Sequence, residues 1–265
     1  MGEVCKANGA DIRIDIEIMK LSIITINYNN LDGLKRTYDS VVSQTCQDFE
    51  WIIIDGGSTD GSKEFIEEHQ AQFAYWCSES DKGIYNAMNK GIAKAKGEYL
   101  NFMNSGDCFY DEKSLSYFYE SKDSSVDVYY GDAIFFDADG NVFLELKLPD
   151  QIDENFYPSG RNLSHQSSFI KASILKNRQY DESYKLAADG ELFYWLLLRK
   201  YKFKHLDKIL VSGEIPGLSS NIEEAQLEVS RFISDNIKKA PFQYKVKRWL
   251  GRFIKGIQRW KIYFS

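Results

Sequence analysis

Short apolar runs alternate with amphipathic segments over residues 20–107. The apolar runs have the length of buried strands and cover residues 21–26, 50–54, 73–77 and 98–103. The segments between them have the periodicity of helices and cover residues 32–43, 62–69 and 83–95. This alternation predicts an α/β fold, in which a mostly parallel central sheet carries helices on both faces.

After residue 110 the order of the elements changes. Asp139-Gly140 between two strand-like runs indicates a hairpin. The strands expected in this half cover residues 126–136, 142–147, 167–170, 203–206 and 209–212, and the helices cover 112–120, 187–200, 222–239 and 244–260. We therefore expect one α/β domain over residues 19–215, preceded by an extension (1–18) and followed by a basic amphipathic helical segment (216–265).

Composition excludes several classes of protein. Hydrophobic residues make up 43 % of the 265 residues and charged residues 27 %, which is typical of a globular chain and not of a disordered one. Since no apolar run approaches the roughly 20 residues that span a bilayer, we expect no membrane-spanning helix. The N-terminus lacks the pattern of a signal peptide. The four cysteines lie far apart without a CxxC pair, which favours reduced thiols over a disulfide framework or a zinc site.

The charge is distributed unevenly. Residues 236–265 contain nine Lys or Arg and no Asp or Glu, whereas the remaining residues carry 24 basic and 39 acidic side chains. A helix over 244–260 would place its tryptophans on an apolar face opposite the basic one, which suits an anionic membrane surface contacted by residues 241–265. Packing of this helix on the domain is the alternative. The acidic body argues against nucleic acid as a partner.

Polar residues follow each of the first four expected strands. In open parallel sheets, ligands bind beyond the carboxyl ends of the strands. The residues at these positions are Asn27–Asn30, Asp55–Asp60, Ser80–Gly83 and Asn104–Asp107. The segment from Gly56 is not a G-x-G-x-x-G dinucleotide motif, because Ser58 stands where that motif requires glycine. The sequence also contains no P-loop motif. We therefore expect a ligand site at this sheet edge that uses neither motif.

At residues 20–215 the chain resembles the family-2 glycosyltransferases of the GT-A fold. The similar segments are SIITINYNN, WIIIDGGSTDGS, DKGIYNAMNKGIAKAKGEYLNFMNSGD, HQSSFI and AADGELF, in order and spacing. The resemblance is closest to bacterial members that build surface polysaccharides. It implies an inverting transfer of a sugar from a nucleotide-diphosphate sugar, bound across the strand tips, to an acceptor.

The resemblance also implies roles for donor-binding residues. Asp55 matches the acidic residue that recognises the base, and either uracil or guanine offers a ring N–H to such a carboxylate. Thr25 and Asn27 match residues around the base and ribose. Asp81 resembles a nucleoside contact, and Lys82 is a candidate to reach the diphosphate as a point charge.

Asp107 matches the end of the family's D-x-D region, which supplies oxygen ligands to Mg²⁺ or Mn²⁺. In this chain the region has a single carboxylate, together with Asn104 and Ser105, which we include among the donor-binding residues. A second departure is Met88, which stands where many relatives carry an arginine. With methionine at this position, the chain would either lack the phosphate contact of that arginine or make it with Lys82 instead.

Asp189 matches the catalytic base of the family. An inverting transfer needs a carboxylate that takes the proton from the attacking acceptor hydroxyl. Glu191 is the second candidate for this role. His165 is a candidate substrate or metal ligand, with a structural role as the alternative.

The sequence thus predicts a metal-dependent glycosyltransferase, peripherally associated with the cytoplasmic membrane. Its donor would be a nucleotide sugar, with UDP favoured, and its acceptor a glycan or lipid-linked molecule. Two alternatives are a nucleotidyltransferase that makes a nucleotide sugar and a non-catalytic glycan-binding scaffold. The first is disfavoured because residues 27–30 lack a Gly-rich basic loop. The sequence does not indicate the oligomeric state.

Overall fold

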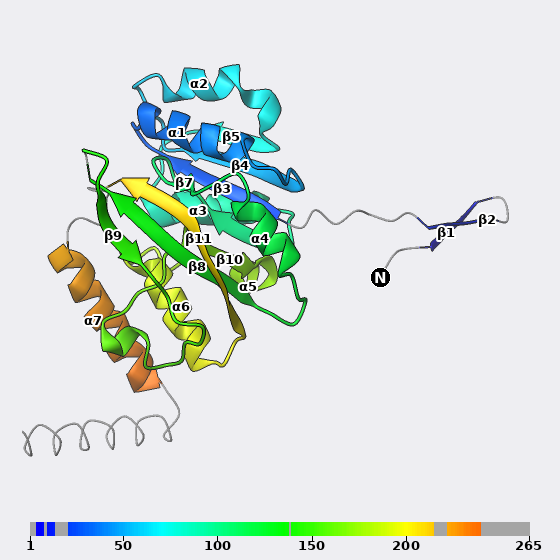
Figure 1. Cartoon of the computed structure of the whole chain (residues 1–265). Coiled ribbons are helices and arrows are strands. Elements are labelled where there is room, and N and C mark those ends of the chain that lie inside the picture. The colour runs from blue at the N-terminus through cyan, green and yellow to red at the C-terminus, as the bar shows by residue number, and fades with distance from the viewer. Residues whose placement is uncertain (1–3, 8–9, 14–20, 138, 215–221, 240–265) are drawn as a thin grey trace, which may run out of the picture.

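A computed structural model describes residues 4–7, 10–13, 21–137, 139–214 and 222–239. Its main body is a nine-stranded sheet with helices on both faces (Figure 1). The strands run in the order β5-β4-β3-β6-β10-β8-β11-β7, and β9 pairs with β8 outside this path. Residues 4–7 and 10–13 form a separate two-stranded sheet, β1–β2 (Val4–Ala7 and Ala10–Arg13).

Four parallel strands form the first half of the sheet, as expected. They are β3 (Leu21–Asn27), β4 (Phe49–Asp55), β5 (Tyr75–Ser78) and β6 (Tyr99–Phe102). The helices that connect them are α1 (Leu31–Val42), α2 (Ser62–Glu68) and α3 (Ile84–Lys94). In this register Asn27 lies beside Asp55, and Asp55 lies beside Ser78. The polar strand ends therefore meet at one edge.

The second half of the sheet is mixed. Strand β10 pairs antiparallel with both β6 and β8, whereas β11 pairs parallel with β8. These strands are β7 (Cys108–Phe109), β8 (Val128–Phe136), β9 (Val142–Leu146), β10 (Ser168–Lys171) and β11 (Phe203–Glu214). The helices here are α4 (Ser114–Glu120), α5 (Ala172–Asn177), α6 (Ala188–Leu198) and α7 (Ile222–Lys239).

Each face of the sheet has its own hydrophobic core, because alternate residues of a strand point to opposite faces. Ile24 and Ile52 pack on the side of α3, α5 and α6, whereas Ile23 and Trp51 pack on the side of α1, α2 and α4. Met88 of α3 is fully buried in the first of these cores. It therefore takes no part in phosphate binding, and its apolar side chain is explained by packing.

The structure differs from the sequence-based expectation in two respects. Residues 203–206 and 209–212 belong to one strand, β11, whose register with β8 shifts near Asp207, a residue with φ of 26°. The register shifts twice, between His205 and Ile209 and between Ile209 and Val211, and this irregular stretch interrupts the strand pattern in the sequence. Strand β7 and helix α5 are too short to produce a periodic signal. The expected helix over 244–260 lies outside the described residues.

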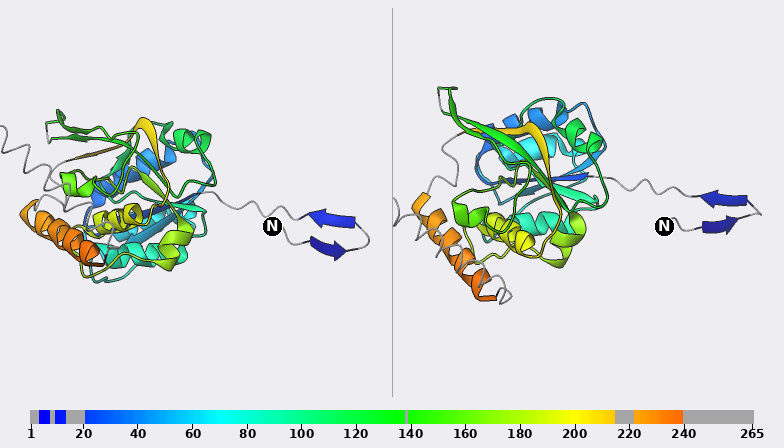
Figure 2. Two further views of the ribbon diagram at one scale, coloured as in Figure 1. Left: turned by 90° about the horizontal axis from the view of Figure 1, so that it is seen from below. Right: turned by 60° about the horizontal axis from the view of Figure 1, so that its bottom comes forward.

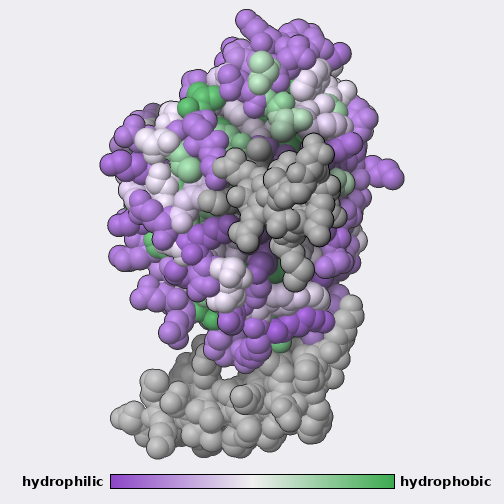
Figure 3. Space-filling view, turned by 90° about the vertical axis from the view of Figure 1, so that its right-hand side faces the viewer, coloured by the Kyte–Doolittle hydropathy of each residue, from purple (hydrophilic) through white to green (hydrophobic). Residues whose placement is uncertain are grey.

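Helix α7 lies along α6 at one end of the molecule (Figures 1 and 2). Phe232 of α7 is fully buried in the core of that side. On the face shown in Figure 3 the surface is mainly hydrophilic, with small scattered apolar areas. Within the described part of the chain, no helix has the length and apolar character needed to cross a bilayer.

Candidate active site

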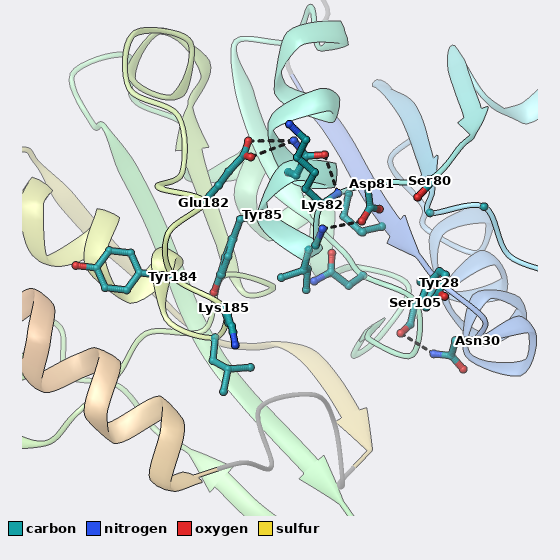
Figure 4. A pocket seen from close by; sticks show the side chains of 18 of the residues that line it. Tyr28, Asn30, Ser80, Asp81, Lys82, Tyr85, Ser105, Glu182, Tyr184 and Lys185 are labelled. Carbon is teal, nitrogen blue, oxygen red and sulfur yellow. Dashed lines mark hydrogen bonds between the residues drawn. The ribbon is translucent and has the colours of Figure 1, made fainter.

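A cavity of about 890 Å³ opens at the carboxyl edge of the parallel strands. One wall is formed by the segments that follow β3, β4, β5 and β6, and the other by residues 182–186 (Figure 4). Of the predicted site residues, four line it: Asp81, Lys82, Asn104 and Ser105. The polar strand tips therefore do converge on one cavity, as the sheet topology predicts.

Asp55 lies beneath this cavity and is fully buried. Its Oδ1 accepts hydrogen bonds from Asn27 Nδ2 (2.7 Å) and Ser58 Oγ (2.5 Å). Its Oδ2 accepts from Ser78 Oγ (2.5 Å) and from the backbone N–H groups of Ser58 (2.9 Å) and Gly57 (3.2 Å). A carboxylate has about four lone-pair positions, so a ring N–H of a base would have to displace one of these donors.

The pKa of Asp55 is lower than that of an ordinary aspartate. Burial alone would raise it, but the hydrogen bonds from Ser58, Ser78 and Asn27 outweigh burial and stabilise the ionised form. Asp55 is thus a charged anchor for the turn after β4. In this structure it shapes the floor of the cavity through Gly56 and Gly57, which line it.

Thr25 and Asn27, expected around the base and ribose, also lie below the cavity surface. The hydroxyl of Thr25 accepts a hydrogen bond from the indole of Trp51 (2.9 Å), and the residue is fully buried. Asn27 is 1 % exposed and is bonded to Asp55 and Ser58. Both residues therefore support the loops from inside the sheet, since β3 carries their side chains below the cavity surface.

Tyr28 is a cavity residue to which the sequence reasoning gave no role of its own. It is 66 % exposed and lines the cavity beside Gly56. A Cβ added at Gly56 would come within 3.0 Å of the Tyr28 ring and 2.9 Å of Asp81 Oδ2. An aromatic ring, a carboxylate and a bare backbone thus lie together at this end of the cavity (Figure 4).

Residues 104–107 form a tight turn after β6, and Asn30 Nδ2 donates to the carbonyl of Ser105 (3.0 Å) (Figure 4). The N–H of Asp107 donates to the carbonyl of Asn104 (2.9 Å), and Thr37 Oγ1 donates to the carbonyl of Asp107 (2.8 Å). Asp107 Oδ2 accepts a hydrogen bond from Gln166 Nε2 (3.0 Å). Burial raises the pKa of Asp107 above the ordinary value, although His165 and Gln166 act in the other direction.

Asp189 lies in the first turn of α6 and is 8 % exposed. Its Oδ1 accepts from the hydroxyl of Tyr85 (3.0 Å), a residue that lines the cavity, and its Oδ2 lies 2.9 Å from His165 Nδ1. His165 Nε2 lies 3.0 Å from Asn104 Nδ2. Both contacts are satisfied when Nδ1 carries the proton and donates to Asp189 while Nε2 accepts from the Asn104 amide.

These contacts determine the protonation of Asp189. Burial would raise its pKa, but the hydrogen bonds from His165, the N–H of Gly190 and the Tyr85 hydroxyl together lower it below the ordinary value. Burial would lower the pKa of His165, but the carboxylates of Asp189 and Asp107 outweigh this effect and raise the pKa above its ordinary value. Asp189 is therefore ionised at neutral pH, as a proton acceptor must be.

Glu191, the second candidate for the base, has a different environment. Both of its oxygens accept hydrogen bonds from Arg178 Nη2 (2.8 and 2.6 Å), and Asn236 Nδ2 lies 3.3 Å from Oε1. It is 6 % exposed and does not line the cavity. Its contacts make Glu191 a structural ion-pair partner that joins α6 to the end of α5 and to α7.

The turn at 104–107 offers oxygen atoms to a hard cation. In the part of the chain that the structure describes, no cluster of three or more His, Cys, Asp or Glu side chains is arranged to hold a metal ion. Among the same residues, however, Asn104 Oδ1 and Ser105 Oγ are buried without a hydrogen-bond partner, close in sequence to the Asp107 carboxylate. One carboxylate with neutral oxygens fits Mg²⁺ or Mn²⁺, which take further ligands from substrate phosphates.

Comparison with known proteins identifies the relatives of this chain. The model of the family described as Glycosyl transferase family 2 matches residues 22–206. An uncharacterized glycosyltransferase of Mycobacterium tuberculosis is 37 % identical over 175 residues, which are 64 % of this chain and 66 % of that protein. A PGL/p-HBAD biosynthesis glycosyltransferase of Mycobacterium bovis is 28 % identical over 179 residues, with the same shares of the two chains. The matches thus span slightly less than two thirds of these relatives.

Two solved structures share the fold. TarS of S. aureus (residues 1–349) in complex with UDP-GlcNAc superposes with a TM-score of 0.64 at 19 % identity, covering 84 % of this chain and 68 % of that one. A mannosyltransferase of Pyrobaculum calidifontis in complex with GDP-Man and Mn²⁺ gives a TM-score of 0.63 at 14 % identity, covering 84 % and 66 %. The expected GT-A fold is confirmed by this likeness.

Proposed function

Because this chain belongs to glycosyltransferase family 2, we propose that it moves a sugar from a nucleoside-diphosphate sugar to a hydroxyl of a glycan or lipid-linked acceptor, with inversion at the anomeric carbon. The observation that carries the proposal is the position of Asp189 next to Tyr85, a residue of the cavity wall. A buried, ionised carboxylate at the edge of a cavity lined by strand tips is what a single displacement requires.

The proposed reaction is one in-line displacement. The acceptor oxygen forms a bond to the anomeric carbon while the bond from that carbon to the leaving phosphate oxygen breaks. The acceptor proton passes to a carboxylate oxygen of Asp189, and the nucleoside diphosphate leaves with the electron pair. His165 and Tyr85 hold the carboxylate in place, and by lowering its pKa they keep it unprotonated before the reaction.

The donor would lie across the strand tips. We assign the base to the end of the cavity at Tyr28 and Gly56, where an exposed ring provides a stacking surface and Asp81 offers an acceptor. Lys82 lines the same cavity and would provide positive charge to the diphosphate. Asp55, with Asn27 and Thr25 behind it, would support this subsite from beneath.

A divalent cation, Mg²⁺ or Mn²⁺, would be held by Asp107 with Asn104 and Ser105 as neighbouring oxygen donors. When bound, such an ion neutralises charge on the leaving diphosphate. The solved structure with Mn²⁺ and GDP-Man belongs to a protein of the same fold, and another neighbour of this fold binds UDP-GlcNAc. We favour UDP as the carrier, and surface polysaccharide or glycolipid synthesis as the pathway class.

The experiment that tests this function is a donor screen followed by product analysis. UDP- and GDP-sugars are tested for stabilisation against thermal unfolding with and without Mn²⁺, and the best donor is then incubated with glycan and lipid-linked acceptors. Transfer with inverted anomeric configuration, determined by NMR, supports the proposal. Release of pyrophosphate from a sugar phosphate and a nucleoside triphosphate would contradict it and favour a nucleotidyltransferase.

The C-terminal segment supports a proposal about location. Residues 241–265 lie outside the described residues, but their composition is basic and rich in tryptophan. We assign to them contact with an anionic membrane surface, which would place the protein at the inner face of the cytoplasmic membrane near a lipid-linked acceptor. Deletion of 241–265 should abolish binding to liposomes that contain anionic lipid. Undiminished binding would contradict this location.

A further inference from the structure

The helix that carries Asp189 has no cap of its own. Helix α6 begins at Ala188 after Ala187, and no side chain of the N-cap residue bonds to its first turn. Alanine is a poor N-cap because it offers no side-chain acceptor to the free N–H groups at a helix start. Something else must therefore hold the segment that leads into α6.

Glu228 of α7 holds the segment that leads into α6. Its Oε1 accepts from the N–H of Lys185 (2.8 Å), and its Oε2 accepts from the N–H groups of Leu186 (2.9 Å) and Ala187 (2.9 Å). One carboxylate thus binds three consecutive backbone amides. Hydrogen bonds to an ionised acceptor are about twice as strong as neutral ones, and consecutive amides form a natural anion-binding concavity.

Other contacts fix α7 against the same segment. The guanidinium of Arg231 lies 4.5 Å from the centre of the Tyr184 ring and donates to Ser183 Oγ (3.0 Å). Phe232 is fully buried, and its ring would lie 3.4 Å from a Cβ added at Gly190. The orientation of Glu228 is therefore set by a helix that is itself packed on the start of α6 and on the segment before it.

We propose that Glu228 is a positioning residue for Asp189, which lies two residues after Ala187, the last of the clamped amides. The carboxylate of Asp189 is held by Tyr85 and His165 on its cavity side, and Glu228 holds the backbone that carries it. The clamped residues Lys185 and Leu186 also line the cavity. This inference rests on the proposed role of Asp189 as the base.

The first test measures the clamp without requiring activity. Amide hydrogen exchange, followed by mass spectrometry, is compared in the full chain for wild type, Glu228→Gln and Glu223→Gln. Glutamine keeps the size but has one acceptor oxygen, and its amide N–H₂ repels the backbone donors. Exchange at residues 185–187 should become about tenfold faster in Glu228→Gln, with no change at residues 21–30. Glu223, exposed on the same helix, is the matched control and should leave exchange unchanged.

The second test separates positioning from general loss of structure. In Glu228→Gln, kcat for sugar transfer should fall about 10- to 100-fold, because a small displacement of a catalytic group is costly, while the Kd for the nucleotide sugar stays within about twofold. Glu228→Asp keeps the negative charge on a side chain that is shorter by one methylene. Its kcat should lie between those of wild type and Glu228→Gln. It also serves as the test variant if Glu228→Gln does not fold.

Three results would overturn the inference. These are unchanged exchange at 185–187, an unchanged kcat despite faster exchange, and a loss of donor affinity in parallel with kcat. A wild-type protein without any transfer activity would instead contradict the proposed function. In that case the exchange experiment alone would still decide whether Glu228 clamps the start of α6.

Discussion

His165 Nδ1 lies 2.9 Å from Asp189 Oδ2, and both side chains are nearly buried. The other ring nitrogen of His165 contacts Asn104, in the turn that also contains Asp107. A single imidazole therefore links α6 to the turn after β6. The next residue, Gln166, bonds to Asp107. Residues 165 and 166 therefore position Asp189, the proposed base, relative to Asp107, the proposed metal ligand.

Replacing His165 should change the pH dependence of transfer. Because His165 lowers the pKa of Asp189, its loss in His165→Ala should raise that pKa and move the acid limb of kcat/KM to higher pH. We also expect kcat at neutral pH to fall about 10- to 100-fold. The measurement is a pH–rate profile, with His69→Ala as a control at a histidine that does not line the cavity. An acid limb at the wild-type position would refute the assigned contact.

Glu191→Gln should reduce stability and not catalysis. Without the carboxylate, the guanidinium of Arg178 loses its partner, which costs about 3 kcal/mol and lowers Tm by about 6–12 °C. Thermal unfolding and kcat per folded molecule are measured together. A loss of turnover at full stability would instead return Glu191 to the role of base.

Asp55→Asn should destabilise the protein in a pH-dependent manner. The folded-state pKa of Asp55 lies below its unfolded value, so its ionised form contributes stability above the unfolded pKa and loses it as pH falls through the folded pKa. The difference in unfolding free energy between wild type and Asp55→Asn should be about 3 kcal/mol at pH 7 and should shrink below pH 4, about the ordinary aspartate pKa. Chemical denaturation across this pH range tests it. A constant difference would mean that the charge is unimportant.

Tyr28→Ala should weaken binding of the donor nucleotide. Loss of a stacking ring costs about 1–3 kcal/mol per base in comparable aromatic contacts, so Kd should rise about tenfold or more, while Tyr28→Phe should bind as wild type does. Tyr110 is also exposed but does not line the cavity, so Tyr110→Ala is the control. If Tyr28→Ala binds UDP and GDP as tightly as the control variant Tyr110→Ala does, the base does not lie at Tyr28.

Much of the site follows from the sequence because parallel strands bring their ends together. Residues after β5 and β6, such as Asp81 and Asn104, were expected at one edge and line one cavity. The same reasoning cannot predict whether a side chain lines the cavity or is buried beneath its surface. Asn27 and Asp55 follow the same pattern but lie beneath the cavity, where they bond to each other and to Ser58 and Ser78.

Contacts between distant segments were the least predictable part. Nothing in the local sequence connects Glu228 with Ala187, or Gln166 with Asp107, because these pairs depend on how α7 and the segment before β10 pack on the domain. The short elements β7 and α5 are likewise set by tertiary contacts rather than by periodicity. In contrast, the packing of Met88 agrees with its apolar character once α3 is placed on the sheet.

The central claim is that Asp189 takes the proton of the acceptor. The most direct test compares the rate of sugar transfer by Asp189→Asn with that of the wild-type protein, at a donor concentration that saturates both. Asparagine preserves the shape of the side chain but does not accept a proton at neutral pH. We predict a fall in kcat of about 10²- to 10⁴-fold, with the Kd for the nucleotide sugar unchanged in calorimetry. Transfer at the wild-type rate by Asp189→Asn would contradict the account.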